Sequence, residues 1–240
     1  MRKNDEIEEV TPPPASAPEP APVKVAVWDL PTRLFHWALV ALLGLSWWSA
    51  EQDELELHFY SGYAILTLLL FRILWGLFGS STARFRNFLK GPAAVLAYLR
   101  DTKGWRAVGH TPIGALSVIA LLGVTALQVV SGLFNSDDDG LNEGPLAPLV
   151  SNLFADAAHE VHDIAFNVLQ ILIILHIAAI LFYRLVLGKK LVGPMISGKA
   201  ALDPDTEPMR PGRGWLAIVC LLVALGVTRW IIGGAPPFGT

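Results

Sequence analysis

Five long apolar runs constrain this chain more than any other feature of its sequence. They lie at roughly Leu34–Ala50, Phe59–Phe78, Ile113–Phe134, Ile164–Leu187 and Trp215–Ile232. Each run approaches or exceeds the ~17–25 residues that a helix needs to cross a bilayer. Charged residues make up only 16% of the chain, against about 25% in an average soluble domain. The sequence therefore predicts an all-α integral membrane protein with five transmembrane helices.

Charges in the connections between these runs alternate in sign. Two connections, 79–112 and 184–213, carry six Lys or Arg each, whereas the other two carry none and hold acids instead. Because basic loops stay on the cytoplasmic side, the N-terminus and both basic connections should be cytoplasmic. The acidic connections and the C-terminus should then face the periplasm of a bacterial inner (plasma) membrane. The longer acidic connection, 135–158, is either a solvated loop or a docking face whose acids steer a basic soluble partner.

Composition divides the chain into three parts. Residues 1–22 are rich in Pro, Ala and Glu and predict a disordered cytoplasmic tail. Residues 23–200 form the predicted transmembrane domain, and 201–240 form a linker with one additional transmembrane helix. The chain has a single cysteine, Cys220, and no CxxCH motif, so any haem would be bound without a covalent link.

Two histidines, His162 and His176, lie fourteen residues apart on the helix predicted around the fourth run. Fourteen steps of about 100° come within about 40° of whole turns, so both rings leave one face of the helix. The two positions are ~21 Å apart along the axis, which is most of the ~30 Å hydrocarbon core. His159 competes as a ligand, but its ring points about 100° away from that of His176.

The first two runs supply the partners for these histidines. His58 begins the second run at the outer side, and His36 lies one turn inside the cytoplasmic end of the first run. Depth in the membrane therefore pairs His58 with His162 and His36 with His176. Histidines inside a bilayer are costly and usually functional. Two histidine pairs at two depths predict two non-covalent, bis-histidine haem b groups, with these four residues as the iron ligands.

Two further polar residues belong near the inner pair. Arg72 lies fourteen residues after His58, on nearly the same helix face, and His110 precedes the third run. We expect both to contact a haem propionate or a quinone. The alternatives are an arginine that reaches the headgroups and a solvated interfacial histidine.

Several motifs resemble those of the prokaryotic cytochrome b proteins of the nickel–iron hydrogenase cytochrome b subunit type. They are the opening Val27–Trp37, the stretch His58–Arg72, the segment Gly109–Gly114 and the pair His162 and His176. The resemblance covers about 28–198. It implies a four-helix transmembrane bundle with two haems on His36, His58, His162 and His176. The fifth helix and the proline-rich tail would be additions.

The resemblance also implies a function, namely electron exchange between membrane quinones and a redox partner. That partner is a hydrogenase, a cytochrome c or another respiratory enzyme, and the sequence does not choose among them. Two alternatives remain open. The scaffold could act alone as a haem oxidoreductase on a small molecule such as superoxide. Less favoured is a metal-handling membrane transporter whose histidines bind zinc or copper.

Overall fold

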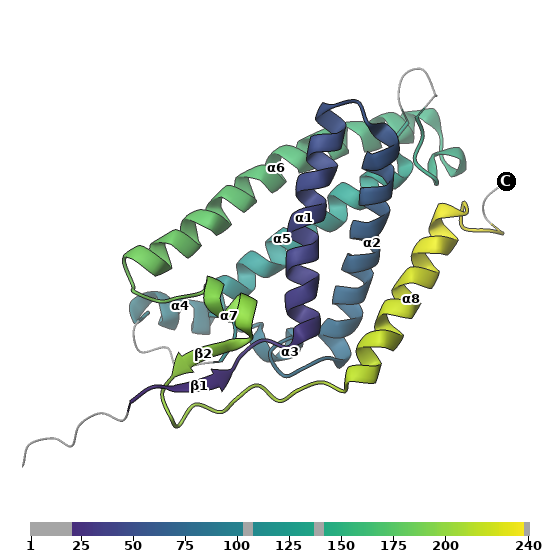
Figure 1. Cartoon of the computed structure of the whole chain (residues 1–240). Helices are drawn as coiled ribbons and strands as arrows, with labels where there is room; N and C mark the ends of the chain where they lie inside the picture. The colour runs from purple at the N-terminus through teal and green to yellow at the C-terminus, as the bar shows by residue number, and fades with distance from the viewer. Residues whose placement is uncertain (1–20, 103–107, 137–141, 238–240) are drawn as a thin grey trace, which may run out of the picture.

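The computed structural model describes residues 21–102, 108–136 and 142–237, and it is mostly helical (Figure 1). The long helices are α1 (Leu30–Glu51), α2 (Leu55–Phe78), α5 (Pro112–Phe134), α6 (Asn152–Leu185) and α8 (Gly214–Ile232). The short elements are β1 (Val23–Ala26), α3 (Phe85–Phe88), α4 (Pro92–Arg100), the 3-10 helix η1 (Ala147–Leu149), α7 (Val192–Ser197) and β2 (Lys199–Leu202). The predicted tail, 1–22, falls almost wholly outside the described residues.

The long helices pack as neighbours in a bundle. In Figure 1, α1 and α2 form a hairpin, α5 and α6 run side by side, and α8 covers the free side of α2. A buried cluster joins α1, α2 and α8 through Phe35, Phe71, Trp75, Cys220 and Ala224. The hydroxyl groups of Thr67 and Thr228 share a buried hydrogen bond of 2.9 Å between α2 and α8.

Three of the long helices begin at a residue that caps them. The side chains of Asp29, Thr111 and Ser151 accept hydrogen bonds from the free backbone N–H groups at the starts of α1, α5 and α6. Proline occupies the first turn of α1 and of α5, where its missing N–H costs nothing. The sequence thus sets these helix starts locally.

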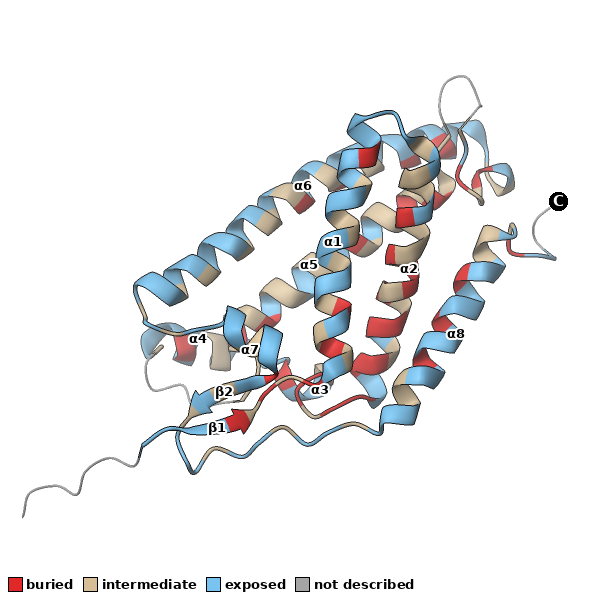
Figure 2. Cartoon of the chain, in the orientation of Figure 1, coloured by how far each residue is buried: buried red, intermediate tan, exposed pale blue. Residues whose placement is uncertain are grey.

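Four of the described helices are long and apolar enough to cross a membrane, namely α2, α5, α6 and α8. Few residues of α5, α6 and α8 are buried in the bundle, which suits contact with lipid, whereas α2 is half buried among its neighbours (Figure 2). The helical membrane bundle predicted from the sequence is therefore confirmed. The first predicted span, α1, stays a prediction, because Arg33, His36 and three tryptophans make its sequence less apolar than the other four.

The bundle has two chemically different ends. The acidic end holds the α1–α2 loop and the connection from α5 to α6, at the top of Figure 1. The basic end holds residues 79–102, 108–111 and 186–213. Helix α6 has 34 residues and is therefore about 51 Å long, so it extends well beyond a ~30 Å hydrocarbon core. It begins at Asn152, which makes part of the predicted outer connection helical.

The basic end contains a feature that an all-α prediction misses. Strands β1 and β2 pair antiparallel, with Val23 opposite Leu202 and Ala26 opposite Lys199. The next residues continue the contact, since Met209 N–H donates to Ala26 O and Ser81 N–H donates to Arg210 O. The first bond ties the residue that ends β1 to the segment before α8. The second bond ties the residues after α2 to that same segment. Strand β2 continues past residue 200, and the division of the chain at that residue stays a prediction.

Candidate functional site: two histidine pairs and a buried arginine

His58 and His162 meet between α2 and α6 at the acidic end. Their ring centroids are 6.1 Å apart and both rings are half-buried. Two imidazoles on opposite sides of one metal ion have centroids about 6 Å apart, because each metal–nitrogen bond is about 2 Å. The separation of these rings therefore fits a pair of axial ligands. The fold brings together the two residues that depth had paired.

Both rings are oriented in the same way. His58 Nδ1 donates to Ser46 O at 2.9 Å, and His162 Nδ1 donates to Gln128 O at 2.8 Å. A serine hydroxyl lies near each Nδ1 as well, Ser46 Oγ at 3.3 Å and Ser131 Oγ at 3.4 Å. Because Nδ1 carries the proton in each ring, Nε2 keeps its lone pair for a metal.

Gly132 on α5 makes room for one of these rings. A Cβ atom at this position would lie 3.0 Å from His162 Cε1, which is closer than carbon atoms normally pack. The sequence did not single out Gly132, Ser46 or Gln128 as part of the site. Two of the three act through backbone carbonyls, which leave no mark in a side-chain pattern.

His36 of α1 and His176 of α6 were predicted as the second pair, and both lie on the part of their helix toward the basic end. His36 also packs edge-on against Trp37, with ring centroids 5.0 Å apart. His36 Nδ1 is buried without a hydrogen-bond partner in the described structure, so this ring is less firmly oriented than those of the first pair.

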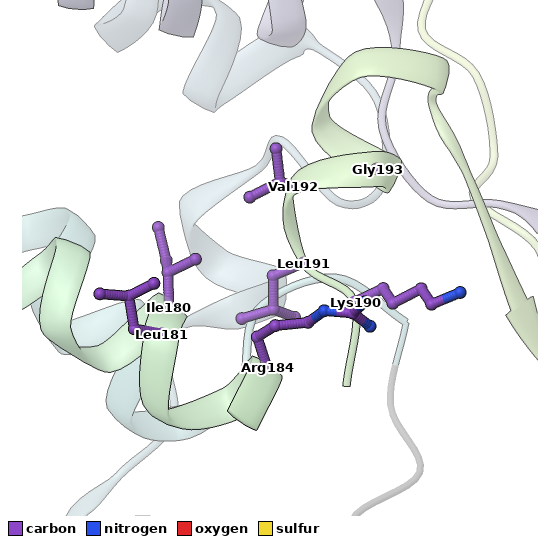
Figure 3. Close-up of a pocket in the computed structure, with 7 residues that line it drawn as sticks. All are labelled: Ile180, Leu181, Arg184, Lys190, Leu191, Val192 and Gly193. Carbon is purple, nitrogen blue, oxygen red and sulfur yellow. The ribbon is translucent and has the colours of Figure 1, made fainter. Parts of the chain in front are cut away.

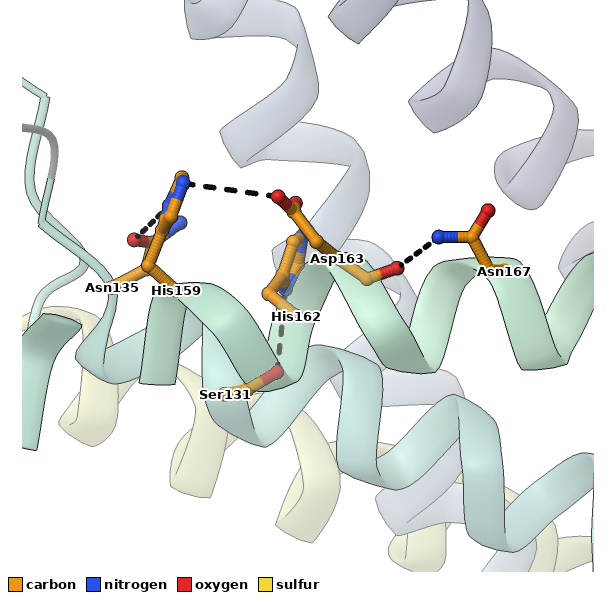
Figure 4. Close-up of polar contacts among 6 residues, drawn as sticks. All are labelled: Ser131, Asn135, His159, His162, Asp163 and Asn167. Carbon is orange, nitrogen blue, oxygen red and sulfur yellow. Dashed lines mark hydrogen bonds and ion pairs between the residues drawn. The ribbon is translucent and has the colours of Figure 1, made fainter. Parts of the chain in front are cut away.

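His159 is placed apart from both pairs (Figure 4). Its Nδ1 is 3.0 Å from Asn135 Oδ1, and its Nε2 is 3.8 Å from Asp163 Oδ2. Figure 4 shows this exposed network on α6, with Asn167 donating to the backbone oxygen of Asp163. His159 therefore has polar partners at the surface, whereas His162 lies against Ser131 and faces His58.

Arg72 and His110 are brought together at the basic end. Arg72 is only 3% exposed, and its guanidinium lies over the Phe85 ring at 4.7 Å. His110 packs against the rings of Trp28 and Phe88, with centroids 4.6 and 4.5 Å away. Arg72 Nη1 and His110 Nδ1 are both buried without a hydrogen-bond partner in the described structure. A polar ligand could form hydrogen bonds with both of these buried nitrogen atoms.

Asp29 supports this cluster in three ways. Its Oδ1 accepts from Thr32 N–H at 2.6 Å and caps α1, while its Oδ2 accepts from Trp75 Nε1 at 3.1 Å. Its negative charge also attracts the positive charge of the Arg72 guanidinium. Only the cap is local in the sequence, because the indole and the guanidinium arrive from α2.

A pocket of about 550 Å³ opens beside His110. One wall comes from residues 81–90 and the other from 205–210, the segment that precedes α8. The pocket connects the buried cluster to the surface of the basic end. A polar molecule could therefore approach His110 without passing through the bundle.

His110 should make stability depend on pH. Burial first, and the charge of Arg72 second, lower the pKa of His110 to about 3. The unfolded chain binds a proton near pH 6.5 but the folded chain does not, so stability falls as pH drops below about 6.5. We expect a loss of about 2 kcal/mol between pH 7 and pH 5. Unfolding titrations should show this slope, and His110→Gln should reduce it; an equal slope in the variant would contradict the assignment.

Comparison with known families agrees with this arrangement. A family model described as prokaryotic cytochrome b561 matches residues 27–198, a range that includes both histidine pairs, Arg72 and His110. No curated protein matches the chain in sequence.

The fold and site define a multi-pass helical membrane protein of the haem-binding electron-transfer class. The chain belongs to the prokaryotic cytochrome b561 family. The resemblance to bacterial membrane cytochromes b is thereby confirmed. Haem b is the cofactor that membership implies, and membrane components and redox proteins are the expected class of partners.

Proposed function

We propose that this chain exchanges electrons between a membrane quinone and a redox protein outside the membrane, with two haem b groups as its cofactors. His58 and His162 would hold one haem, and His36 and His176 the other. Five spans, α1 included, would place the N-terminus in the cytoplasm and the C-terminus in the periplasm of a bacterial inner membrane.

One observation carries this proposal: the centroids of two imidazoles lie 6.1 Å apart, and both Nδ1 atoms donate to backbone carbonyls. Haem needs only two protein ligands, since its macrocycle supplies four nitrogens, and with two imidazoles it exchanges electrons without an open coordination position. The carbonyls of Ser46 and Gln128 fix the rings and raise the basicity of Nε2. Two axial imidazoles held in place by these carbonyls favour electron transfer over a reaction that makes or breaks bonds at the iron.

The quinone site would lie at the basic end, near Arg72 and His110. A quinone oxygen accepts hydrogen bonds, and a neutral imidazole or a guanidinium can donate them. His110 stays neutral at physiological pH, because burial lowers its pKa to about 3. The adjacent pocket of about 550 Å³ gives access from the surface.

The redox partner would dock at the acidic end. Exposed acids lie in this region, within a few residues of His58 or His162 in the chain: Glu51, Asp53, Glu54, Glu56, Asp156, Glu160 and Asp163. Opposite charge on a partner raises the association rate at low salt. A hydrogenase, a cytochrome c or another respiratory enzyme with a basic face would fit. Three further acids of the predicted outer connection, at 137–139, lie outside the described residues.

The decisive experiment is to count haem and reduce it with quinol. We expect a pyridine haemochrome assay on purified protein to give two haem b per chain, and a quinol analogue to reduce them. Arg72→Gln and His110→Gln should slow quinol-dependent reduction while dithionite still reduces both haems. One haem, or bound zinc or copper in its place, would overturn the di-haem proposal. Two haems that quinol cannot reduce would overturn the quinone link.

His159→Ala should leave the haem content unchanged. The side chain is exposed and bonded to Asn135 and Asp163, so its removal breaks a surface network that contributes at most about 1 kcal/mol. Absorbance spectra and haem counts of the variant should match those of the unaltered chain. If one haem is lost, His159 replaces His162 as the ligand at the acidic end.

A further inference from the structure

A pocket of about 280 Å³ lies beside the last turn of α6 at the basic end (Figure 3). Aliphatic side chains from α6 and from the chain entering α7 form most of its lining, together with two cationic side chains. The lining residues are Ile180, Leu181, Arg184, Lys190, Leu191, Val192 and Gly193. The pocket lining is therefore mostly apolar and carries two positive charges.

Its position is the boundary of a membrane-spanning helix. Helix α6 is one of the four helices able to cross a bilayer, and Arg184 lies in its last turn. Leu181, Leu191 and Val192 remain exposed, so the bundle does not use this apolar surface for its own packing. An apolar surface at this depth faces lipid.

The two cations have no acidic partner within the described residues, where the ion pairs involve other side chains. Two like charges that line one pocket repel each other, and an anion between them offsets that repulsion. An arginine that only extends to the lipid headgroups is the alternative to a binding site. It would explain neither the second cation nor the aliphatic pocket.

We propose that this pocket binds one anionic phospholipid. The phosphate would lie between Arg184 and Lys190, and an acyl chain would follow Leu181, Leu191 and Val192. Basic pockets at the ends of transmembrane helices recognise such headgroups by the same combination of charge and apolar contact. The bound lipid would join the end of α6 to α7. Met195 O and Ile196 O of α7 accept hydrogen bonds from Trp37 and Arg33 of α1, so the lipid would also steady the segment beside His36.

Native mass spectrometry of the haem-loaded protein in neutral detergent tests this proposal. The probes are dioleoyl phosphatidylglycerol and dioleoyl phosphatidylcholine, added separately. We expect retention of one phosphatidylglycerol and weaker retention of phosphatidylcholine. Arg184→Gln with Lys190→Gln should lower the affinity for phosphatidylglycerol about 25-fold, since each cation near an anionic lipid contributes about fivefold.

The matched control is Arg100→Gln with Lys199→Gln, which removes two exposed cations of the basic end that do not line the pocket. It should bind phosphatidylglycerol as the unaltered chain does. Leu191→Asn keeps both cations and should weaken retention of both lipids. Equal retention of the two lipids by the unaltered chain would overturn the proposal. So would an equal loss in the control pair, or displacement of the lipid by inorganic phosphate alone.

Discussion

We expect His162→Ala to hold only one of the two haem b groups proposed for this chain. The variant removes one of two facing imidazoles, and the remaining ring of His58 keeps its bond to Ser46 O but loses the partner 6.1 Å away. Iron with one protein ligand is held less tightly and exposes a coordination position. The pyridine haemochrome assay should therefore give half the haem, with far-UV circular dichroism showing that the helices remain.

Double variants test the pairing itself. His58→Ala with His162→Ala should still hold one haem, because both changes fall on one site. His36→Ala with His162→Ala should hold none, because each change falls on a different site. The reverse result, one haem in the second variant and none in the first, would show that the pairs are wrongly assigned. The His159→Ala variant serves as the control for a histidine lost from the same turn of α6.

Asp29→Ala should destabilise the protein by about 3 kcal/mol. The change removes the cap of α1, which is worth about 1 kcal/mol, and leaves the Trp75 indole N–H buried without an acceptor, at about 1–3 kcal/mol. It also removes the negative charge that acts on buried Arg72. Unfolding in a detergent titration, followed by circular dichroism, measures the loss.

Two variants separate these contributions. Asp29→Asn keeps a side-chain oxygen for Thr32 N–H but loses the charge, so its effect should fall between those of the unaltered chain and Asp29→Ala. Ser151→Ala removes only the cap of α6 and should cost about 1 kcal/mol. If Asp29→Ala costs no more than Ser151→Ala, the bonds of Asp29 to α2 do not matter for stability.

The helices could be predicted from the sequence with fair accuracy, although their ends could not. The apolar runs at 59–78, 113–134 and 215–232 agree closely with α2, α5 and α8. The fourth run begins twelve residues after α6 does, at Ile164 rather than Asn152. The first turns of α6 carry polar and small residues, so hydropathy misses them although Ser151 caps them.

The candidate site could be predicted from the sequence only in part. Histidines fourteen residues apart lie on one face of a helix, so the shared face of His162 and His176 follows from helical geometry alone. The partners Ser46 and Gln128 could not be predicted, because they contribute backbone oxygens from other helices. The strand pair of β1 and β2 was also missed, since four-residue strands separated by 172 residues leave no periodic pattern.

The amino-acid pattern was enough to establish the membrane class of this protein and its family. These properties depend on local composition, on the 3.6-residue period and on loop charge, all of which act within one segment. The packing of the helices brought the imidazoles of His58 and His162 together and gave each Nδ1 a backbone oxygen to donate to. It also decided that Asp29 would reach Trp75 and Arg72. Those outcomes depend on how helices rotate and approach one another, and that is set by packing between segments far apart in the chain.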